Sequence, residues 1–136
     1  MWCRKSRFRA TPLAHTTCFL VLAALFNGCA PTDPTSIQSP SGKYRVFATI
    51  EEVSLIHIHL TNSEGVELDA VYSGASDAMK WALGWMTDED VVVLQSSDVG
   101  TRAYDILDNH LVARPEAFKD EAIRSRADEL RSEKYR

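Results

Sequence analysis

Apolar and polar residues alternate along four successive segments between residues 43 and 86, and a period of two is typical of strands that bury one face. Short turns separate the segments; residues 62–65 are one of them, with Gly65 available for a positive φ. Strands joined by short turns pair in the antiparallel sense, so the sequence predicts a meander with one buried face. The apolar positions are Tyr44, Val46, Ala48 and Ile50, then Ile56, Ile58 and Leu60, then Val66, Leu68, Ala70 and Tyr72, and finally Met79, Trp81, Leu83 and Trp85.

Residues 91–94 differ from these segments because all four are apolar. A strand that is apolar on both faces is expected inside a sheet that is covered on each side. Residues 102–106 add another strand, after which Asp108 and Asn109 supply turn chemistry. We therefore expect about six strands in an antiparallel β domain over residues 42–113.

Residues 114–136 carry the pattern of an amphipathic helix, which makes the expected fold class α+β. Pro115 suits the first position of a helix. The helix can pack its apolar stripe over the sheet and so provide the second cover for residues 91–94, which is what we expect. The alternative is a projecting helix that binds a partner. The stripe consists of Phe118, Ala122, Ile123, Ala127 and Leu130.

The N-terminus has the three parts of a secretory signal peptide. Residues 1–15 contain four basic residues and no acidic ones, and residues 18–26 form an unbroken apolar run. Small residues follow at Asn27 and Gly28, as they do at cleavage sites. Nine apolar residues are too few for a membrane span, which needs about 20. The alternative is a short buried helix, which would not normally follow four unpaired cations.

The segment Leu25-Phe26-Asn27-Gly28-Cys29 resembles the lipobox of bacterial lipoproteins. The resemblance implies a signal peptide over residues 1–28, cleavage before Cys29, and attachment of fatty acids such as palmitate to that cysteine. Several acyl chains would form a stable membrane anchor. Ala30 and Pro31 follow, without the aspartate that retains such proteins in the inner membrane of enteric bacteria. The implied location is therefore the outer membrane, facing the periplasm.

The other cysteines are consistent with this address. Cys3 and Cys18 would be removed with the signal peptide, and no cysteine follows Cys29. A lone thiol in an oxidising compartment would be unusual, and lipidation of Cys29 removes that difficulty. Residues 29–41, with three prolines, are expected to form an extended tether.

The charge of the expected mature chain is strongly negative. Residues 30–136 hold all 19 acidic residues but only 11 of the 15 basic ones, a net charge of −8. Nucleic acid requires a basic face, so we expect no nucleic-acid partner. The expected partners are the membrane, through the lipid on Cys29, and an envelope protein.

Two stretches of the β domain resemble the repeat of the periplasmic Tol-system propeller and its WD-like relatives. One is Ser39-Pro40-Ser41-Gly42-Lys43-Tyr44, and the other is residues 84–94 followed by Ser97, Gly100, Tyr104 and Asp105. The resemblance implies a blade-like sheet. A propeller needs at least four blades of four strands, so this chain is too short to be one, and propeller function does not carry over.

His57 and His59 are the candidate metal ligands, because they are two residues apart on one face of a strand, with Glu67 or Asp69 as a third donor. The competing interpretation, which we prefer, makes them polar residues on a solvent-facing surface, with no metal and no cofactor. The acidic run at residues 88–90 lacks the glycine and distal glutamate of an EF-hand. Ser96 and Ser97 lack a nucleophile elbow, so we expect no hydrolase.

Trp81 and Trp85 are the candidate binding surface, because with Leu83 they could line a concave site for a sugar or a peptide. The competing interpretation, which we prefer, is that they belong to the core, where large aromatic side chains often lie. The sequence thus favours a membrane-anchored, non-enzymatic module that binds an envelope protein or a glycan. The alternatives are a metal-binding factor or enzyme using His57 and His59, and an accessory subunit that acts through its C-terminal helix.

Overall fold

A computed structural model describes residues 35–136, apart from the side chain of Glu52, and these residues form eight strands in two antiparallel four-stranded sheets. Sheet A contains β1 (Ile37–Gln38), β2 (Tyr44–Glu51), β3 (Leu55–Asn62) and β4 (Glu67–Ser76). Sheet B contains β5 (Trp81–Trp85), β6 (Val92–Ser96), β7 (Gly100–Leu107) and β8 (His110–Ala113). The helical elements are η1 (Glu52–Ser54), η2 (Ala117–Lys119) and α1 (Glu121–Lys134).

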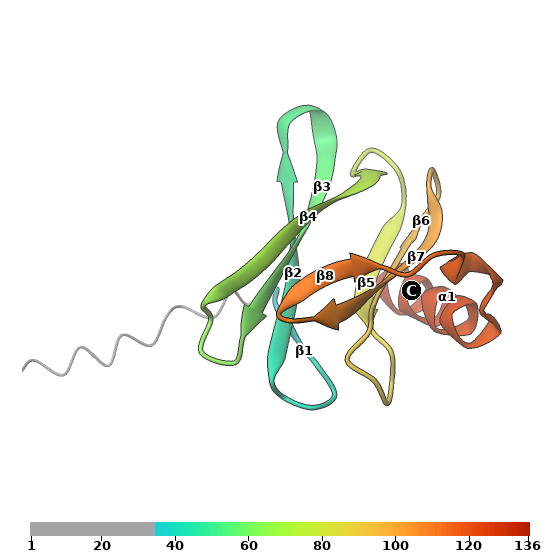
Figure 1. Ribbon diagram of the computed structural model, residues 1–136. Coiled ribbons are helices and arrows are strands. Elements are labelled where there is room, and N and C mark those ends of the chain that lie inside the picture. The colour runs from blue at the N-terminus through green and yellow to red at the C-terminus, as the bar shows by residue number, and fades with distance from the viewer. Residues whose placement is uncertain (1–34) are drawn as a thin grey trace, which may run out of the picture.

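Sheet A, sheet B and α1 are stacked as three layers in that order (Figure 1). The main core lies between the two sheets and consists of Val46, Ile56, Ile58, Leu60, Ala75, Trp85, Val92, Leu94, Tyr104 and Leu111. A second core lies between sheet B and the helical segment and consists of Ala82, Val91, Val93, Ala103, Ala117, Ile123, Ala127 and Leu130.

The double coverage expected for residues 91–94 is confirmed. Val92 and Leu94 face the main core, whereas Val91 and Val93 face the helix, and all four are buried. The two cores cover both faces of β6. Since β6 lies between β5 and β7, it also has a neighbouring strand on each edge. This arrangement explains why the segment is apolar throughout.

Alternation correctly predicts the buried face of β3 and, apart from the exposed Ile50, that of β2, but not that of β4. The ladder between β3 and β4 shifts register after the pair Leu60–Asp69, since the next pair is Thr61–Glu67. A bulge of one residue turns the following side chains to the other face of a sheet. The inward residues of β4 are consequently Val71, Ser73 and Ala75, while the predicted Ala70 and Tyr72 are exposed.

The prediction of a single blade of about six strands is wrong in number and arrangement. The two missed strands are β1, which has two residues, and β8, which has four and only one buried position, Leu111. Such short strands show too few alternations to be recognised. Each sheet is itself a four-stranded meander, and β4 does not pair with β5.

The expected tether at residues 29–41 ends sooner than predicted. Ile37 pairs with Val46 and Gln38 with Arg45, so this part of the segment is a strand of sheet A. Ser39 is buried as well. The expected signal peptide and Cys29 lie outside the described residues.

The C-terminal helix packs on sheet B, as expected, but it begins later than predicted. The side chain of Asp120 accepts hydrogen bonds from the backbone N–H groups of Ala122 and Ile123, so Asp120 is the N-cap of α1. The predicted start at Pro115 is therefore wrong. Phe118 lies in η2 and is 55% exposed, so its predicted place in the core is wrong. The projecting helix is also excluded, because Ile123, Ala127 and Leu130 are buried against the sheet.

Close contact between α1 and sheet B depends on Gly84. A Cβ atom at this position would lie 2.5 Å from Cδ2 of Leu130, so no larger residue fits without movement.

Within residues 35–136, no helix is both long enough and apolar enough to cross a membrane.

Candidate functional site

A groove with a volume of about 860 Å³ runs along β5. One wall comes from sheet A and the segment around β1, including Ile37, Pro40 and Ala48. The opposite wall comes from α1, including Arg126 and Leu130. Since β5 is an edge strand of sheet B, the groove follows a strand edge that no other strand covers. Two other pockets on the described surface are smaller, with volumes of about 380 and 470 Å³.

Trp81 and Trp85 both line this groove, but they differ in burial and in contacts. Trp85 is only 4% exposed, packs in the main core and donates from its indole Nε1 to the carbonyl of Ile37 at 2.9 Å. Trp81 is half-buried and donates from Nε1 to Asp77 at 2.8 Å. The ammonium of Lys134 lies 3.3 Å from the centroid of the Trp81 ring. One ring is therefore core, and one face of the other is occupied by a cation.

The ladder between β5 and β6 fixes which backbone groups point into the groove. Met86 N–H donates to the carbonyl of Val91 at 2.9 Å, and Ser97 N–H donates to that of Lys80 at 3.0 Å. In an antiparallel pair only alternate residues exchange such bonds, so the even-numbered residues of this segment bond to β6. The N–H and C=O groups of the odd-numbered residues therefore point away from β6, toward the uncovered edge of β5. These residues are Trp81, Leu83 and Trp85.

Two side chains from the C-terminal helical segment cover the ends of this edge. The hydroxyl of Tyr135 accepts from Trp81 N–H at 2.9 Å and donates to the Trp81 carbonyl at 3.0 Å. Arg126 Nε donates to the carbonyl of Trp85 at 2.8 Å. Neither residue was singled out from the sequence, because nothing in their spacing indicates that they reach a strand about 40 to 54 residues earlier in the chain.

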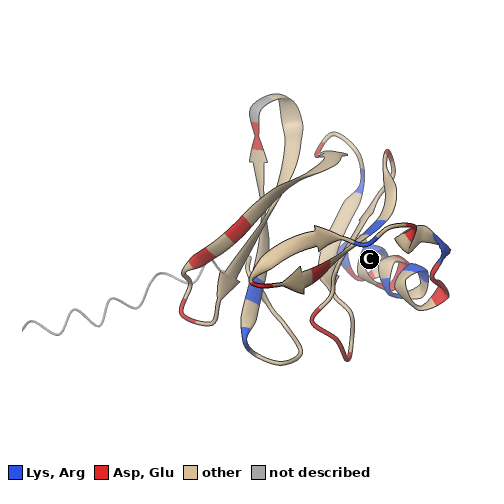
Figure 2. Cartoon of the chain, viewed as in Figure 1, with Lys and Arg blue, Asp and Glu red and all other residues tan. Residues whose placement is uncertain are grey.

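The two basic residues on the helix wall, Arg126 and Lys134, differ in whether they form ion pairs. Arg126 forms ion pairs with Glu129 at 3.0 Å and with Glu133 at 3.6 Å. Lys134 contacts the rings of Trp81 and Tyr135, and no ion pair within residues 35–136 involves it. Figure 2 shows basic and acidic residues together on α1, and further acidic residues along β4 and in several turns. Among the charged residues that line the groove, Lys134 is therefore the cation without an ion-pair partner in the described part of the chain.

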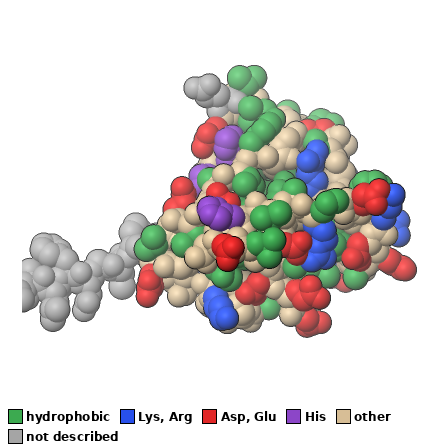
Figure 3. Space-filling view, viewed as in Figure 1, with side chains coloured by type: hydrophobic (Ala, Val, Ile, Leu, Met, Phe, Trp, Pro, Cys, Tyr) green, Lys and Arg blue, Asp and Glu red, His purple; other side chains and the backbone are tan. Residues whose placement is uncertain are grey.

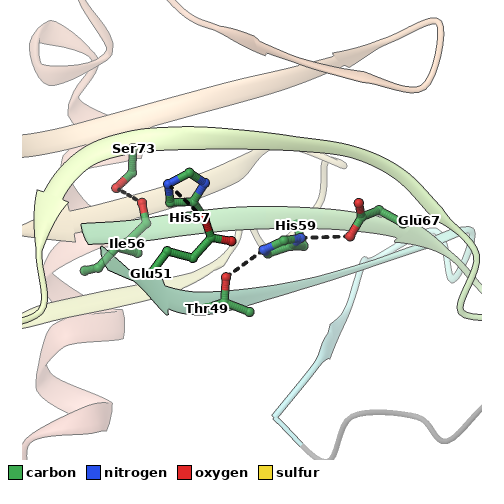
Figure 4. A network of polar contacts seen from close by, with 7 residues as sticks. All are labelled: Thr49, Glu51, Ile56, His57, His59, Glu67 and Ser73. Carbon is green, nitrogen blue, oxygen red and sulfur yellow. Dashed lines mark hydrogen bonds and ion pairs between the residues drawn. The ribbon is translucent and has the colours of Figure 1, made fainter. Parts of the chain in front are cut away.

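The histidines of β3 lie on the outer face of sheet A, away from the groove (Figure 4). His59 Nε2 hydrogen-bonds to the Thr49 hydroxyl at 2.7 Å, and its Nδ1 lies 2.8 Å from Glu67. The ring also stacks on Phe47, with centroids 4.8 Å apart. His57 Nε2 lies 3.7 Å from the carboxylate oxygen Oε2 of Glu51. Both nitrogens of His59 already have partners in the protein, so the geometry gives it a polar structural role.

The remaining candidates for chemistry are engaged in turns and strand contacts. Among the described residues, no group of three His, Cys, Asp or Glu side chains is arranged to hold a metal ion. Asp90 accepts from the backbone N–H of Ser41 at 3.1 Å and from its hydroxyl, which joins the two halves of the domain. Figure 3 shows the histidines among acidic side chains on the surface in view.

Ser96 is buried and donates its hydroxyl to Asp98, which also accepts from Ser76 N–H at 2.9 Å. The hydrogen bond from Ser96 is the main reason that the pKa of Asp98 lies below its ordinary value of 3.8. The carboxylate joins the end of β4 to the turn between β6 and β7. The interaction therefore links the two sheets, and among the described residues no hydrogen bond joins Ser96 to an imidazole.

Comparisons with known proteins add no family to these observations. No protein-family model, no curated protein and no solved structure matches the chain.

Proposed function

We propose that this chain is a non-enzymatic envelope lipoprotein whose β domain binds a protein partner in the groove along β5. The observation that carries the proposal is the edge of β5, which lies uncovered in a groove of about 860 Å³ with apolar side chains on both walls. Apolar grooves with a few placed polar groups are typical binding sites. The lipobox-like sequence ending at Cys29 supports attachment to the outer membrane, facing the periplasm.

The aromatic residues favour a protein over a glycan as the partner. A sugar ring stacks on the open face of an aromatic side chain. Trp85 is almost fully buried, and Lys134 occupies one face of Trp81. The groove thus has little stacking surface, whereas its backbone groups and aliphatic walls suit a polypeptide.

The four-stranded meander order of each sheet supports the resemblance to a propeller blade. We propose that the domain is a pair of blade-like sheets, with β1 at the edge of sheet A and α1 packed on sheet B.

Site-specific photo-crosslinking of the full-length protein in cells tests the proposed function. A photoreactive phenylalanine analogue replaces Thr87, which is exposed and lines the groove. The matched control places it at Tyr72, an exposed aromatic position on the outer face of sheet A. We expect a protein adduct of defined mass at position 87 and none at position 72. Absence of an adduct at position 87, or equal adducts at both positions, would contradict the proposal.

A further inference from the structure

The centre of the β5 edge is open, although both of its ends are covered. Tyr135 bonds to Trp81 at one end, and Arg126 bonds to the Trp85 carbonyl at the other. Between them, the N–H and C=O of Leu83 point away from β6 and have no hydrogen-bond partner among the described residues. Proteins usually protect an exposed edge with charged residues, proline or a covering segment. This edge instead lies in an apolar groove.

We infer that the groove takes an extended segment of a partner protein, which adds to sheet B as a strand beside β5. This inference rests on the proposed function and names the partner's conformation. The N–H and C=O of Leu83 are spaced to exchange two hydrogen bonds with one residue of an added antiparallel strand. The N–H of Trp85 offers a third bond. Backbone pairing of this kind provides affinity, and side-chain pockets provide specificity.

The walls of the groove define the side chains that the segment must carry. Successive side chains of a strand point to opposite faces. The residue beside Leu83 would therefore point toward sheet A, where Ile37 and Ala48 line the groove. The residues before and after it would point toward Leu130 of α1. Both walls are aliphatic at these places, so the segment should have aliphatic residues on both faces.

The unpaired charge on the helix wall adds one further requirement. Lys134 has only aromatic contacts among the described residues, and it lines the groove next to Trp81. Its ammonium can pair with a carboxylate on the bound segment. The partner segment should therefore include an aspartate or a glutamate near one end, although the domain as a whole is acidic.

Tyr135 occupies the place that the bound strand would take if it extended along the whole edge. Its single hydroxyl accepts from one backbone group of Trp81 and donates to the other, as a paired residue would do. A longer segment has to displace this hydroxyl. Tyr135 therefore limits the strand to the centre of the edge and competes with binding.

Selection from a phage library of random heptapeptides, on full-length protein in detergent, tests the inference without assuming a sequence. We expect enrichment of aliphatic heptapeptides that carry an acidic residue. Synthetic versions of the enriched peptides, each with one N-methylated backbone amide, then report on backbone pairing. Methylation should weaken binding at least about tenfold at the one amide that donates to the Leu83 carbonyl, and not at the amides on either side of it, because these face away from β5.

Two protein variants complete the test. Tyr135→Phe removes the competing hydroxyl and should strengthen peptide binding about three- to tenfold, as expected for one released hydrogen-bonding group. The matched control Tyr72→Phe should leave it unchanged. Failure to enrich any peptide, or equal tolerance of N-methylation at every amide, would overturn strand addition. If position 87 still forms adducts in cells, the groove remains a binding site; if it does not, the proposed function fails as well.

Discussion

The hydroxyl of Tyr135 bonds to both backbone groups of Trp81, which lies 54 residues earlier in the chain. The contact fixes the C-terminus of α1 to the edge of sheet B. It also places a side chain where a neighbouring strand would otherwise pair. One residue thus contributes to helix docking and determines how much of the β5 edge is available.

Packing between Gly84 and Leu130 provides a test of the helix layer. Gly84→Ala should destabilise the protein by about 1–3 kcal/mol, because the added methyl group would collide with Leu130. Leu130→Ala should cost about 2–5 kcal/mol by itself. In the Leu130→Ala background the Gly84→Ala change should cost less, with a coupling of at least about 1 kcal/mol in denaturant unfolding.

The control for this cycle is Phe118→Ala. Phe118 is more than half exposed, so its loss should change the free energy of unfolding by no more than about 0.5 kcal/mol. A large loss at position 118, or additive effects at positions 84 and 130, would mean that α1 does not pack as described.

The carboxylate of Asp98 should make stability depend on acid pH. Its folded-state pKa is lowered, mainly by the hydrogen bond from Ser96. A lowered pKa contributes stability that is present above the ordinary value of 3.8 and lost as the pH falls through the folded-state value. Asp98→Asn should therefore reduce stability at neutral pH and flatten its dependence below about pH 4. Asp128→Asn on α1 is the control; identical pH profiles for wild type and Asp98→Asn would refute the linkage.

The histidine pair of sheet A should bind no metal tightly. His59 uses both ring nitrogens, toward Thr49 and Glu67, and metal binding would have to break these contacts. Elemental analysis of the purified protein should find far less than one zinc or copper per chain. A stoichiometric metal that is lost in His59→Ala would reverse this prediction and revive the metal-binding alternative.

Lipidation at Cys29 is a separate prediction about the cellular address. Cells fed a labelled fatty acid should incorporate the label into this protein, and Cys29→Ala should abolish it, because the thiol is the acceptor in the lipobox-like segment. Fractionation should place the wild-type protein in the outer membrane of a host that has one. Retained label in Cys29→Ala would exclude this anchor.

The sequence predicts the parts of the fold that depend on local periodicity. Residues 91–94 are buried on both faces because their apolar run matches a doubly covered strand. The buried face of β4 could not be predicted, since one bulge near Leu68 exchanges the two faces and leaves no mark in the composition. Phe118 was misplaced because helical spacing extends through η2, although α1 begins only at Glu121.

The site was predicted only in part. Trp81 and Trp85 were recognised from their size and spacing, and both line the groove. The groove itself depends on an open backbone edge and on contacts from Arg126 and Tyr135, which are set by tertiary packing. Backbone groups are the same at every residue, so their availability cannot be derived from the sequence.

Amide hydrogen exchange at Leu83 tests the central claim most directly. In the free protein its N–H should exchange rapidly, whereas the N–H groups of Ala82 and Gly84 should be protected by their bonds to β6. When an enriched heptapeptide is bound at saturation, exchange at Leu83 should slow markedly, and exchange at Phe47 on the outer face of sheet A should not change. Unchanged exchange at Leu83 in the saturated complex would contradict strand addition at the β5 edge.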